Sequence, residues 1–132
     1  MDKYGVRIKG IVRCNDEFLI INKWMDDRID EPYQWQFFDT TMAEDESPAD
    51  AALRYILECT GIYANVTCIP YTWTYRLGDN RCIGIAFLCD VPDTVVIMSE
   101  EISEIKWVKA EELDKYITNK SMLRDMHEAG IF

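Results

Sequence analysis

A carboxylate, a phenol and a thiol occur at helical spacing between Phe38 and Ile62, in the stretch FDTTMAEDESPADAALRYILECTGI. Residues at i, i+3 and i+4 of a helix face one point, so Tyr55, Glu58 and Cys59 are expected to converge. Carboxylates there would suit Mg²⁺, which prefers hard oxygen ligands and neutralises charge that develops on phosphates. This sequence offers one carboxylate, a phenol that is neutral near pH 7 and a soft thiol. The stretch therefore predicts a helix with, at most, a poor site for Mg²⁺ at this point.

The segment from Ser47 to Gly61 has the start and stop signals of a helix. The Ser47 hydroxyl can cap free N–H groups, Pro48 suits the first turn, and Gly61 suits the end. An apolar stripe is expected to face the core, formed by Ala49, Ala52, Leu53, Ile56 and Leu57. The opposite, outward side is expected to carry Ala51, Arg54, Tyr55 and Glu58, with Cys59 at the boundary.

Apolar runs predict strands before, between and after helices. The strands are expected at 4–14, 18–24, 35–38, 63–77, 81–91 and 101–109, with 25–34 as a polar loop and 94–98 as an edge strand or part of a loop. Further helices are expected at 110–117 and from near Ser121 towards Gly130. This order predicts an α/β fold in which a mixed sheet is covered on both faces.

The composition fits one globular domain over residues 1–132, because 48% of the residues are apolar and 29% are charged. The formal net charge of −10 makes this acidic protein a poor candidate for binding nucleic acid, since phosphate backbones need basic patches. A small phosphorylated ligand needs only a few local cations or one metal ion, so the charge leaves such a ligand possible.

The cysteines and apolar runs bear on the compartment. Five cysteines are present, an odd count, and no Cys-x-x-Cys pair occurs, which argues against a disulfide framework or a structural zinc site. No run is apolar and long enough to span a membrane, and the N-terminus lacks the apolar core of a signal peptide. A reducing cytoplasm is therefore expected. The single histidine, His127, is expected on a solvated helix face, so a serine-type triad is unsupported.

The order of elements and residues 35–62 resemble the Nudix hydrolase family. That family's signature is Gly, five residues, Glu, seven residues, then Arg-Glu-apolar-x-Glu-Glu-x-Gly-apolar. The sequence matches it without a gap at Glu46, Arg54, Ile56, Glu58, Gly61 and Ile62. Trp35 ahead of the signature and EISEIKWVKAEEL after it are also similar, so the resemblance covers nearly the whole chain. It implies a Nudix-like α/β/α sandwich with a mixed β-sheet.

Departures from the signature fall mainly on the expected metal ligands. Thr40 replaces the glycine, Tyr55 replaces the glutamate after the arginine, and Cys59 replaces the last glutamate. Family members use these glutamates to hold Mg²⁺ or Mn²⁺ against a diphosphate and to prepare an attacking water. The resemblance therefore implies a pyrophosphatase-like protein with a degenerate Nudix box. Cys59 is expected to be an inert thiol rather than a nucleophile.

The resemblance implies catalytic and metal-binding roles for Glu46 and Glu58. It also implies that a late loop supplies a third carboxylate, Glu100 or Glu101, and we choose Glu101. These residues would form a sparser site for Mg²⁺ or Mn²⁺. Each also has a simpler interpretation. Glu46 and Arg54 could form an ion pair that braces the loop against the helix, and Glu58 could be only a solvated side chain.

Basic and aromatic residues are candidates for binding the substrate. Lys23 ends the second predicted strand, where family members often place a basic residue near the substrate phosphates, and Arg13 is a second candidate. In the run YTWTYR, Trp73 and Arg76 could contact a base or a phosphate. Aromatic residues on a strand more often form core or an interface, and an interface would suit a homodimer.

Three functions fit the sequence. The first is a Nudix-type hydrolase of nucleoside diphosphates linked to another group, with weakened or lost magnesium-dependent activity. The second is a nucleotide-binding module that keeps the fold but lacks the chemistry. The third is a structural or interaction protein on the same fold. Release of product from a panel of nucleotides would support the hydrolase. Saturable binding without release would support the binding module, and the absence of both would leave the structural protein.

Overall fold

The computed structural model describes residues 5–24 and 34–131. Within them, six strands form one sheet in the order β4-β5-β1-β2-β6, and β3 also pairs with β1. The elements in chain order are β1 (Gly5–Cys14), β2 (Glu17–Lys23), β3 (Phe38–Thr41), α1 (Pro48–Thr60), β4 (Asn65–Leu77), β5 (Asn80–Asp90), β6 (Ile102–Lys109), the 3₁₀ helix η1 (Ala110–Lys115) and α2 (Lys120–Glu128).

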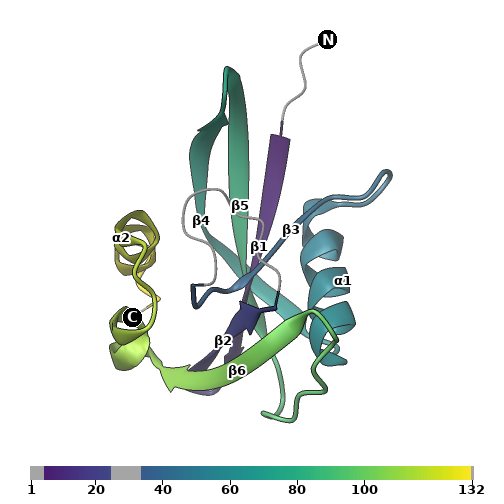
Figure 1. Cartoon of the computed structure of the whole chain (residues 1–132), viewed down its shortest axis with the longest axis vertical. Helices are drawn as coiled ribbons and strands as arrows, with labels where there is room; N and C mark the ends of the chain where they lie inside the picture. Colours follow the sequence, from purple (N-terminus) through teal and green to yellow (C-terminus); the bar gives the residue numbers. More distant parts are fainter. Residues whose placement is uncertain (1–4, 25–33, 132) are drawn as a thin grey trace.

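The sheet is mixed and lies between two helical layers. β1 runs parallel to β5 and antiparallel to β2 and β3, while β2 runs antiparallel to β6. Helix α1 covers one face, and η1 and α2 lie on the other (Figure 1). The predicted α/β/α sandwich with a mixed sheet is confirmed.

The continuous apolar run of β2 is buried on both faces of the sheet, as predicted for a central strand. Leu19 and Ile21 join the cluster under α1, while Phe18 and Ile20 join the cluster under η1 and α2. All four side chains are at most 2% exposed. Two cores therefore hold the helices to opposite faces of the same strands.

Helix α1 begins and ends as predicted from its caps. The Ser47 hydroxyl oxygen accepts a hydrogen bond from the Asp50 N–H at 3.2 Å. Gly61 adopts the left-handed conformation at φ 73°, and its N–H donates to the Leu57 carbonyl at 2.8 Å. This left-handed (αL) end favours glycine because a Cβ atom is strained at that φ.

The buried face of α1 differs from the prediction. The buried residues are Ala51, Ala52, Tyr55, Ile56, Cys59 and Thr60. The helix is therefore rotated towards Tyr55 and Cys59, which are 9% and 0% exposed, instead of presenting them outward or at the boundary. Gly10 of β1 allows the close approach, since a Cβ atom there would lie 3.0 Å from Ile56 Cδ1.

Other boundaries also need correction. The strand expected at 35–38 is wrong: Gln36 forms only an isolated bridge to Ile21, and the strand begins at Phe38. Residues 94–98 form a loop, and the helix expected at 110–117 is a 3₁₀ helix. Helix α2 begins at Lys120, where the Asn119 side chain caps the Met122 N–H. Nearly all of the predicted polar loop 25–34 lies outside the described residues.

Across residues 5–24 and 34–131, the helices are too short or too polar to cross a membrane.

Candidate functional site

The first part of the site is a hydrogen-bonded brace between the β3–α1 connection and the helix. Arg54 Nε donates to Glu46 Oε2 at 2.7 Å, and Arg54 Nη2 donates to Glu46 Oε1 at 3.2 Å. Arg54 Nη2 also donates to the Thr41 carbonyl at 3.0 Å, and the Ala43 N–H donates to Glu46 Oε1 at 2.9 Å. The connection is therefore tied to α1 by a two-pronged ion pair of the kind that arginine and carboxylates favour.

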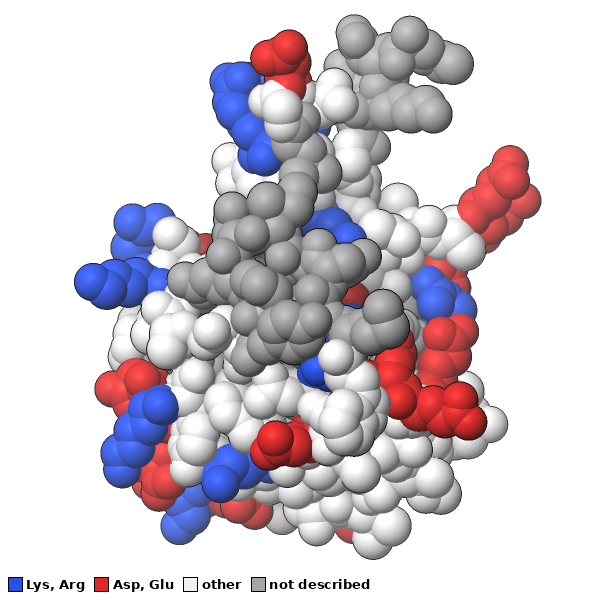
Figure 2. Space-filling model, in the orientation of Figure 1, with Lys and Arg blue, Asp and Glu red and all other residues white. Residues whose placement is uncertain are grey.

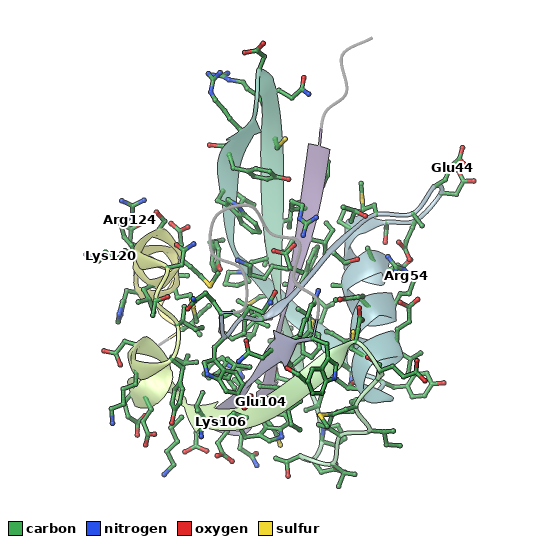
Figure 3. The ribbon with its side chains drawn as sticks, viewed as in Figure 1. Glu44, Arg54, Glu104, Lys106, Lys120 and Arg124 are labelled. Carbon is green, nitrogen blue, oxygen red and sulfur yellow. The ribbon has the colours of Figure 1, made fainter. Side chains whose placement is uncertain are left out.

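This ion pair keeps Glu46 negatively charged. The Arg54 hydrogen bond, followed by that of the Ala43 N–H, lowers the pKa of Glu46 below its usual value. The same pair raises the pKa of Arg54. Figure 3 shows Arg54 on α1 near the connection that carries Glu44. Both oxygens of Glu46 already accept hydrogen bonds, so Glu46 has little capacity left for an ion or a water.

Glu58 is on the same outer side of α1 but is loosely held. Its side chain is 56% exposed, and Arg54 Nη1 lies 3.4 Å from its Oε2 in an i, i+4 pair. Such exposed pairs contribute little to stability. Figure 2 shows acidic side chains grouped around a basic one along this side of the molecule. An incoming ligand or ion could therefore reach the Glu58 carboxylate.

The second part of the site lies at the C-terminal end of α1, where Cys59 contacts Glu101. The Cys59 thiol donates a hydrogen bond to Glu101 Oε1, with Sγ and Oε1 3.0 Å apart. Burial, and then the neighbouring Glu101 carboxylate, raise the pKa of Cys59 to about 12; the positive charge of Lys23 acts in the opposite direction but does not outweigh them. The thiol is therefore neutral and hydrogen-bonded at pH 7, as expected for an inert thiol rather than an activated nucleophile.

Tyr55 and Lys23 lie beside this pair, and we call the side chains of Lys23, Tyr55, Cys59 and Glu101 the inner cluster. Burial is the largest cause that raises the pKa of Tyr55, followed by Cys59 and Glu101, so the phenol stays protonated. Its ring packs edge-on against Phe38 with centroids 6.3 Å apart. The Lys23 ammonium lies 5.3 Å from the centroid of the Tyr55 ring, within the range of a cation–π contact.

The loop before β6 is fixed to α1 and β2 by backbone hydrogen bonds. The Ile97 and Ser99 N–H groups donate to the carbonyls of Thr60 and Cys59 at 3.0 and 3.1 Å. The Trp24 N–H donates to the Glu101 carbonyl at 3.1 Å. The last carbonyls of a helix have no partner within the helix, so the loop satisfies them and at the same time brings Glu101 to Cys59.

A hollow of about 340 Å³ lies at the end of β2. It is lined by Asn22, Lys23, Trp24, Ser103 and Glu104. Figure 3 shows Glu104 on β6. Lys23 is one of its lining residues, but the Lys23 ammonium lies over the Tyr55 ring on the α1 face of the sheet. Asn22, the preceding residue, lies on the other face with Ile20, because successive strand residues point to opposite faces.

The donor atoms do not fit an ordinary magnesium site. Over residues 5–24 and 34–131, no three His, Cys, Asp or Glu side chains lie where they could hold one ion. Glu46, Glu58 and Glu101 were expected to converge, but Glu46 is bonded to Arg54 and Glu101 to Cys59. Helix α1 also buries positions 55 and 59 and leaves Glu58 exposed.

The other predicted substrate-binding residues lie away from this cluster. Arg13 forms a two-pronged ion pair with Asp90, at 2.8 and 3.0 Å, and lies at the opposite end of β2 from Lys23. Trp73 packs on the face of the sheet opposite α1, with the Lys9 ammonium 4.5 Å from its ring centroid. Arg76 is exposed near the β4–β5 turn. The structure therefore brings only Lys23 together with Glu101.

Comparisons with known proteins agree with this architecture. A model of the NUDIX domain matches residues 4–126, which is most of the chain. The chain belongs to the NUDIX family. The curated protein sequences contain no significant match to this NUDIX chain.

Solved structures share the NUDIX fold at low sequence identity. The MutT protein from Methanosarcina mazei Go1 is 23% identical with a TM-score of 0.77, over 96% of this chain and 92% of that one. An Ap4A hydrolase from C. elegans is 18% identical with a TM-score of 0.75, over 94% and 96%. The NUDIX domain of Shewanella oneidensis NrtR, solved with ADP ribose, is 12% identical with a TM-score of 0.73, over 97% and 89%.

NUDIX proteins generally use divalent cations. The inner cluster is unusual for such a protein because its carboxylate is hydrogen-bonded to a neutral thiol. Sequence reasoning recognised the replaced positions 55 and 59 but missed that they contact Lys23 and Glu101. The i, i+4 spacing predicted that the two side chains share one environment, whereas their contacts with Lys23 and Glu101 depend on the tertiary structure.

Proposed function

We propose that this protein binds a ligand built on a nucleoside diphosphate and that its magnesium-dependent hydrolysis of such a ligand is weakened or lost. The observation that carries the proposal is the Cys59–Glu101 hydrogen bond. It commits a carboxylate that would otherwise be available for an ion to a neutral thiol. NUDIX relatives with nucleotide-type compounds in their names, the Ap4A hydrolase and the ADP ribose complex, support the choice of ligand class.

The expected loss of metal affinity follows from the ligand count. A carboxylate–cation contact at a partly desolvated site contributes about 1 to 2 kcal/mol, so two missing contacts weaken binding by roughly 30- to 1,000-fold. Glu58 alone on the exposed side of α1 cannot replace them, because it is shared with Arg54 and well hydrated.

A nucleotide-binding module without catalysis is the second candidate, and the closed inner cluster favours it. Tyr55 and Cys59 are buried and satisfied within the protein, as expected for residues that stabilise a pocket instead of binding an ion. In either case we propose a cytoplasmic protein whose partner is a small phosphorylated ligand, not nucleic acid or a membrane. A homodimer stays a prediction.

The test measures turnover of dinucleotides, nucleoside triphosphates and nucleotide sugars with Mg²⁺ or Mn²⁺. The measured quantity is the release of phosphate or nucleotide. A weakened hydrolase gives slow release that Glu58→Gln abolishes. A binding module gives no release but shows thermal stabilisation that saturates with ligand concentration. Neither release nor stabilisation by any compound would exclude both candidates and leave a structural role.

A double substitution tests the explanation itself. Tyr55→Glu with Cys59→Glu restores the family's carboxylates at both positions, so metal-dependent release is expected to appear or to rise at least tenfold. The matched control, Tyr55→Gln with Cys59→Gln, has side chains of the same size without charge and is expected to stay inactive. If both double variants are folded and equally inactive, the missing carboxylates are not the reason for low activity.

A further inference from the structure

Four large apolar side chains lie on the surface near the C-terminal end of α1, and we call them the apolar patch. Its members are Tyr63, Val95, Ile97 and Met98, which are 80, 71, 75 and 48% exposed. Three of them come from the loop between β5 and β6, and Tyr63 comes from the connection between α1 and β4. Single exposed apolar residues are common, but a group of them on one surface marks an interaction site.

Ile97 brings the two segments of the apolar patch together. A Cβ atom added at Gly61 would lie 3.7 Å from Ile97 Cβ, so the Ile97 side chain lies against the helix end that leads to Tyr63. The neighbouring residues Ile62 and Val96 are partly buried and pack against the core under α1. Each segment therefore has one residue anchored in the core next to a residue that is left outside.

Hydrogen bonds fix the backbone that carries the apolar patch. The Ile97 N–H donates to the Thr60 carbonyl at 3.0 Å, and the Val95 N–H donates to Asp93 Oδ1 at 2.9 Å. The first bond ties the loop to the end of α1, and the second closes a turn at its start. A partner that binds there has little backbone to order, which lowers the entropic cost of association.

The surroundings of the apolar patch are acidic. Segments 55–75 and 82–105, which include the patch, contain no lysine or arginine. Glu58, Asp93 and Glu100 are exposed residues of these segments, and we call them the acidic rim. Figure 2 shows acidic side chains beside an uncharged surface at the lower right, where Figure 1 places the end of α1 and the loop before β6.

Charge distinguishes the possible occupants of the patch. A second copy would place one acidic rim against another in a protein of net charge −10, and like charges across an interface are costly. An anionic membrane surface would be repelled for the same reason. Lys23 also reaches this end of α1, but it is half-buried with its ammonium over the Tyr55 ring. A basic partner is therefore the one that this surface complements.

We propose that the apolar patch binds a basic amphipathic segment of another protein, whose apolar side chains cover the patch and whose lysines or arginines face the acidic rim. Such an interface has the usual apolar centre and polar rim. The charges orient the partner and speed its association, while the buried apolar side chains provide most of the affinity. This inference goes beyond the proposed nucleotide ligand and does not depend on it.

The experiment is fluorescence anisotropy of the full chain with a labelled amphipathic helical peptide of leucine and lysine. A peptide with the same pattern, but with glutamate in place of lysine, is the matched probe. Wild-type protein is expected to bind the Leu/Lys peptide about tenfold or more tightly than the Leu/Glu peptide, because only the first complements the acidic rim. Its affinity is expected to fall at high salt, which screens exposed charges.

Ile97→Ser tests the apolar patch and Glu100→Gln tests the acidic rim. The first is expected to weaken binding of the Leu/Lys peptide about 5- to 30-fold, because it removes a large apolar contact from the centre of the interface. The second removes one rim charge and is expected to weaken binding about two- to fivefold. Thermal unfolding of each variant checks that a loss of binding is not a loss of folding.

The matched controls are Ile83→Ser and Glu44→Gln. Ile83 is an isoleucine of β5 that is 50% exposed and lies outside the patch. Glu44 lies at the far end of the connection between β3 and α1 (Figure 3). Both substitutions make the same chemical change at another place, so they are expected to leave the affinity for the Leu/Lys peptide within about twofold.

Binding that depends on Ile97 and Glu100, and not on Ile83 and Glu44, supports the inference. Equal affinity for the two peptides, an equal loss in Ile97→Ser and Ile83→Ser, or no binding of either peptide overturns it. A dimer in light scattering that Ile97→Ser dissociates would make a second copy the occupant. Binding to neutral phosphatidylcholine vesicles that Ile97→Ser abolishes would make a lipid surface the occupant. Either of these last two results also overturns the basic protein partner.

Discussion

Replacing Cys59 with glutamate is expected to destabilise the protein when no metal is present. Cys59 is fully buried, and its sulfur lies 3.0 Å from Glu101 Oε1. A carboxylate at position 59 would face Glu101 at roughly 4 to 5 Å, where two like charges repel by about 3 to 4 kcal/mol at an effective dielectric constant near 20. Lys23 offsets part of this repulsion, so the net loss in free energy of unfolding is expected to be about 2 to 3 kcal/mol.

The assay is urea unfolding at pH 7 in EDTA, with Cys59→Gln as the control. Glutamine has the size of glutamate without its charge and can donate to Glu101, so the difference between the two variants isolates the charge. Adding MgCl₂ is expected to return part of the loss only in Cys59→Glu, because an ion can then bridge the two carboxylates. Wild-type stability is expected to be unaffected by MgCl₂.

The pH dependence has a definite sign. Repulsion from Glu101 raises the folded-state pKa of the introduced carboxyl above its unfolded value of about 4.3. Below that value the group is protonated in both states, so the Cys59→Glu and Cys59→Gln variants should be equally stable. The deficit should grow as the pH rises through the raised folded-state pKa. Equal stability of the two variants at pH 7 in EDTA would refute the contact between position 59 and a charged Glu101.

Two further predictions concern packing and the Arg13 ion pair. Gly84→Ala is expected to cost about 1 to 3 kcal/mol and to change the tryptophan fluorescence, because a Cβ atom there would lie 2.1 Å from the Trp73 ring; unaltered urea unfolding would contradict that contact. Arg13→Met is expected to lower the free energy of unfolding by about 1 kcal/mol at pH 7. Arg13 lowers the pKa of Asp90, so this contribution is present above pH 4 and should vanish as the pH falls through the folded-state pKa of Asp90. A difference that persists at pH 2, or that Arg76→Met reproduces, would contradict the ion pair as its cause.

The local sequence determined where helix α1 begins and ends, and it contained the NUDIX signature. Ser47, Pro48 and Gly61 act within one or two turns of their own positions, so their capping roles can be read without knowing the fold. The Glu46–Arg54 pair could also be predicted from the sequence, because both residues lie in one signature of fixed spacing. The central burial of β2 followed from its unbroken apolar run.

Tertiary structure decided which side of α1 is buried and what its replaced residues contact. Alanine, leucine and tyrosine side chains give the helix more than one apolar face, and the choice was made by docking on β1 and β3, where Gly10 admits Ile56 and Phe38 receives the Tyr55 ring. Cys59 and Tyr55 contact Glu101 and Lys23, which are far away in the chain. Glu101 is brought there by a loop that satisfies the last carbonyls of the helix, and Lys23 by strand β2. The sequence alone determined that two expected ion ligands are replaced. Only the packed structure shows a charge-balanced cluster in their place, because long-range contacts do not depend on sequence spacing.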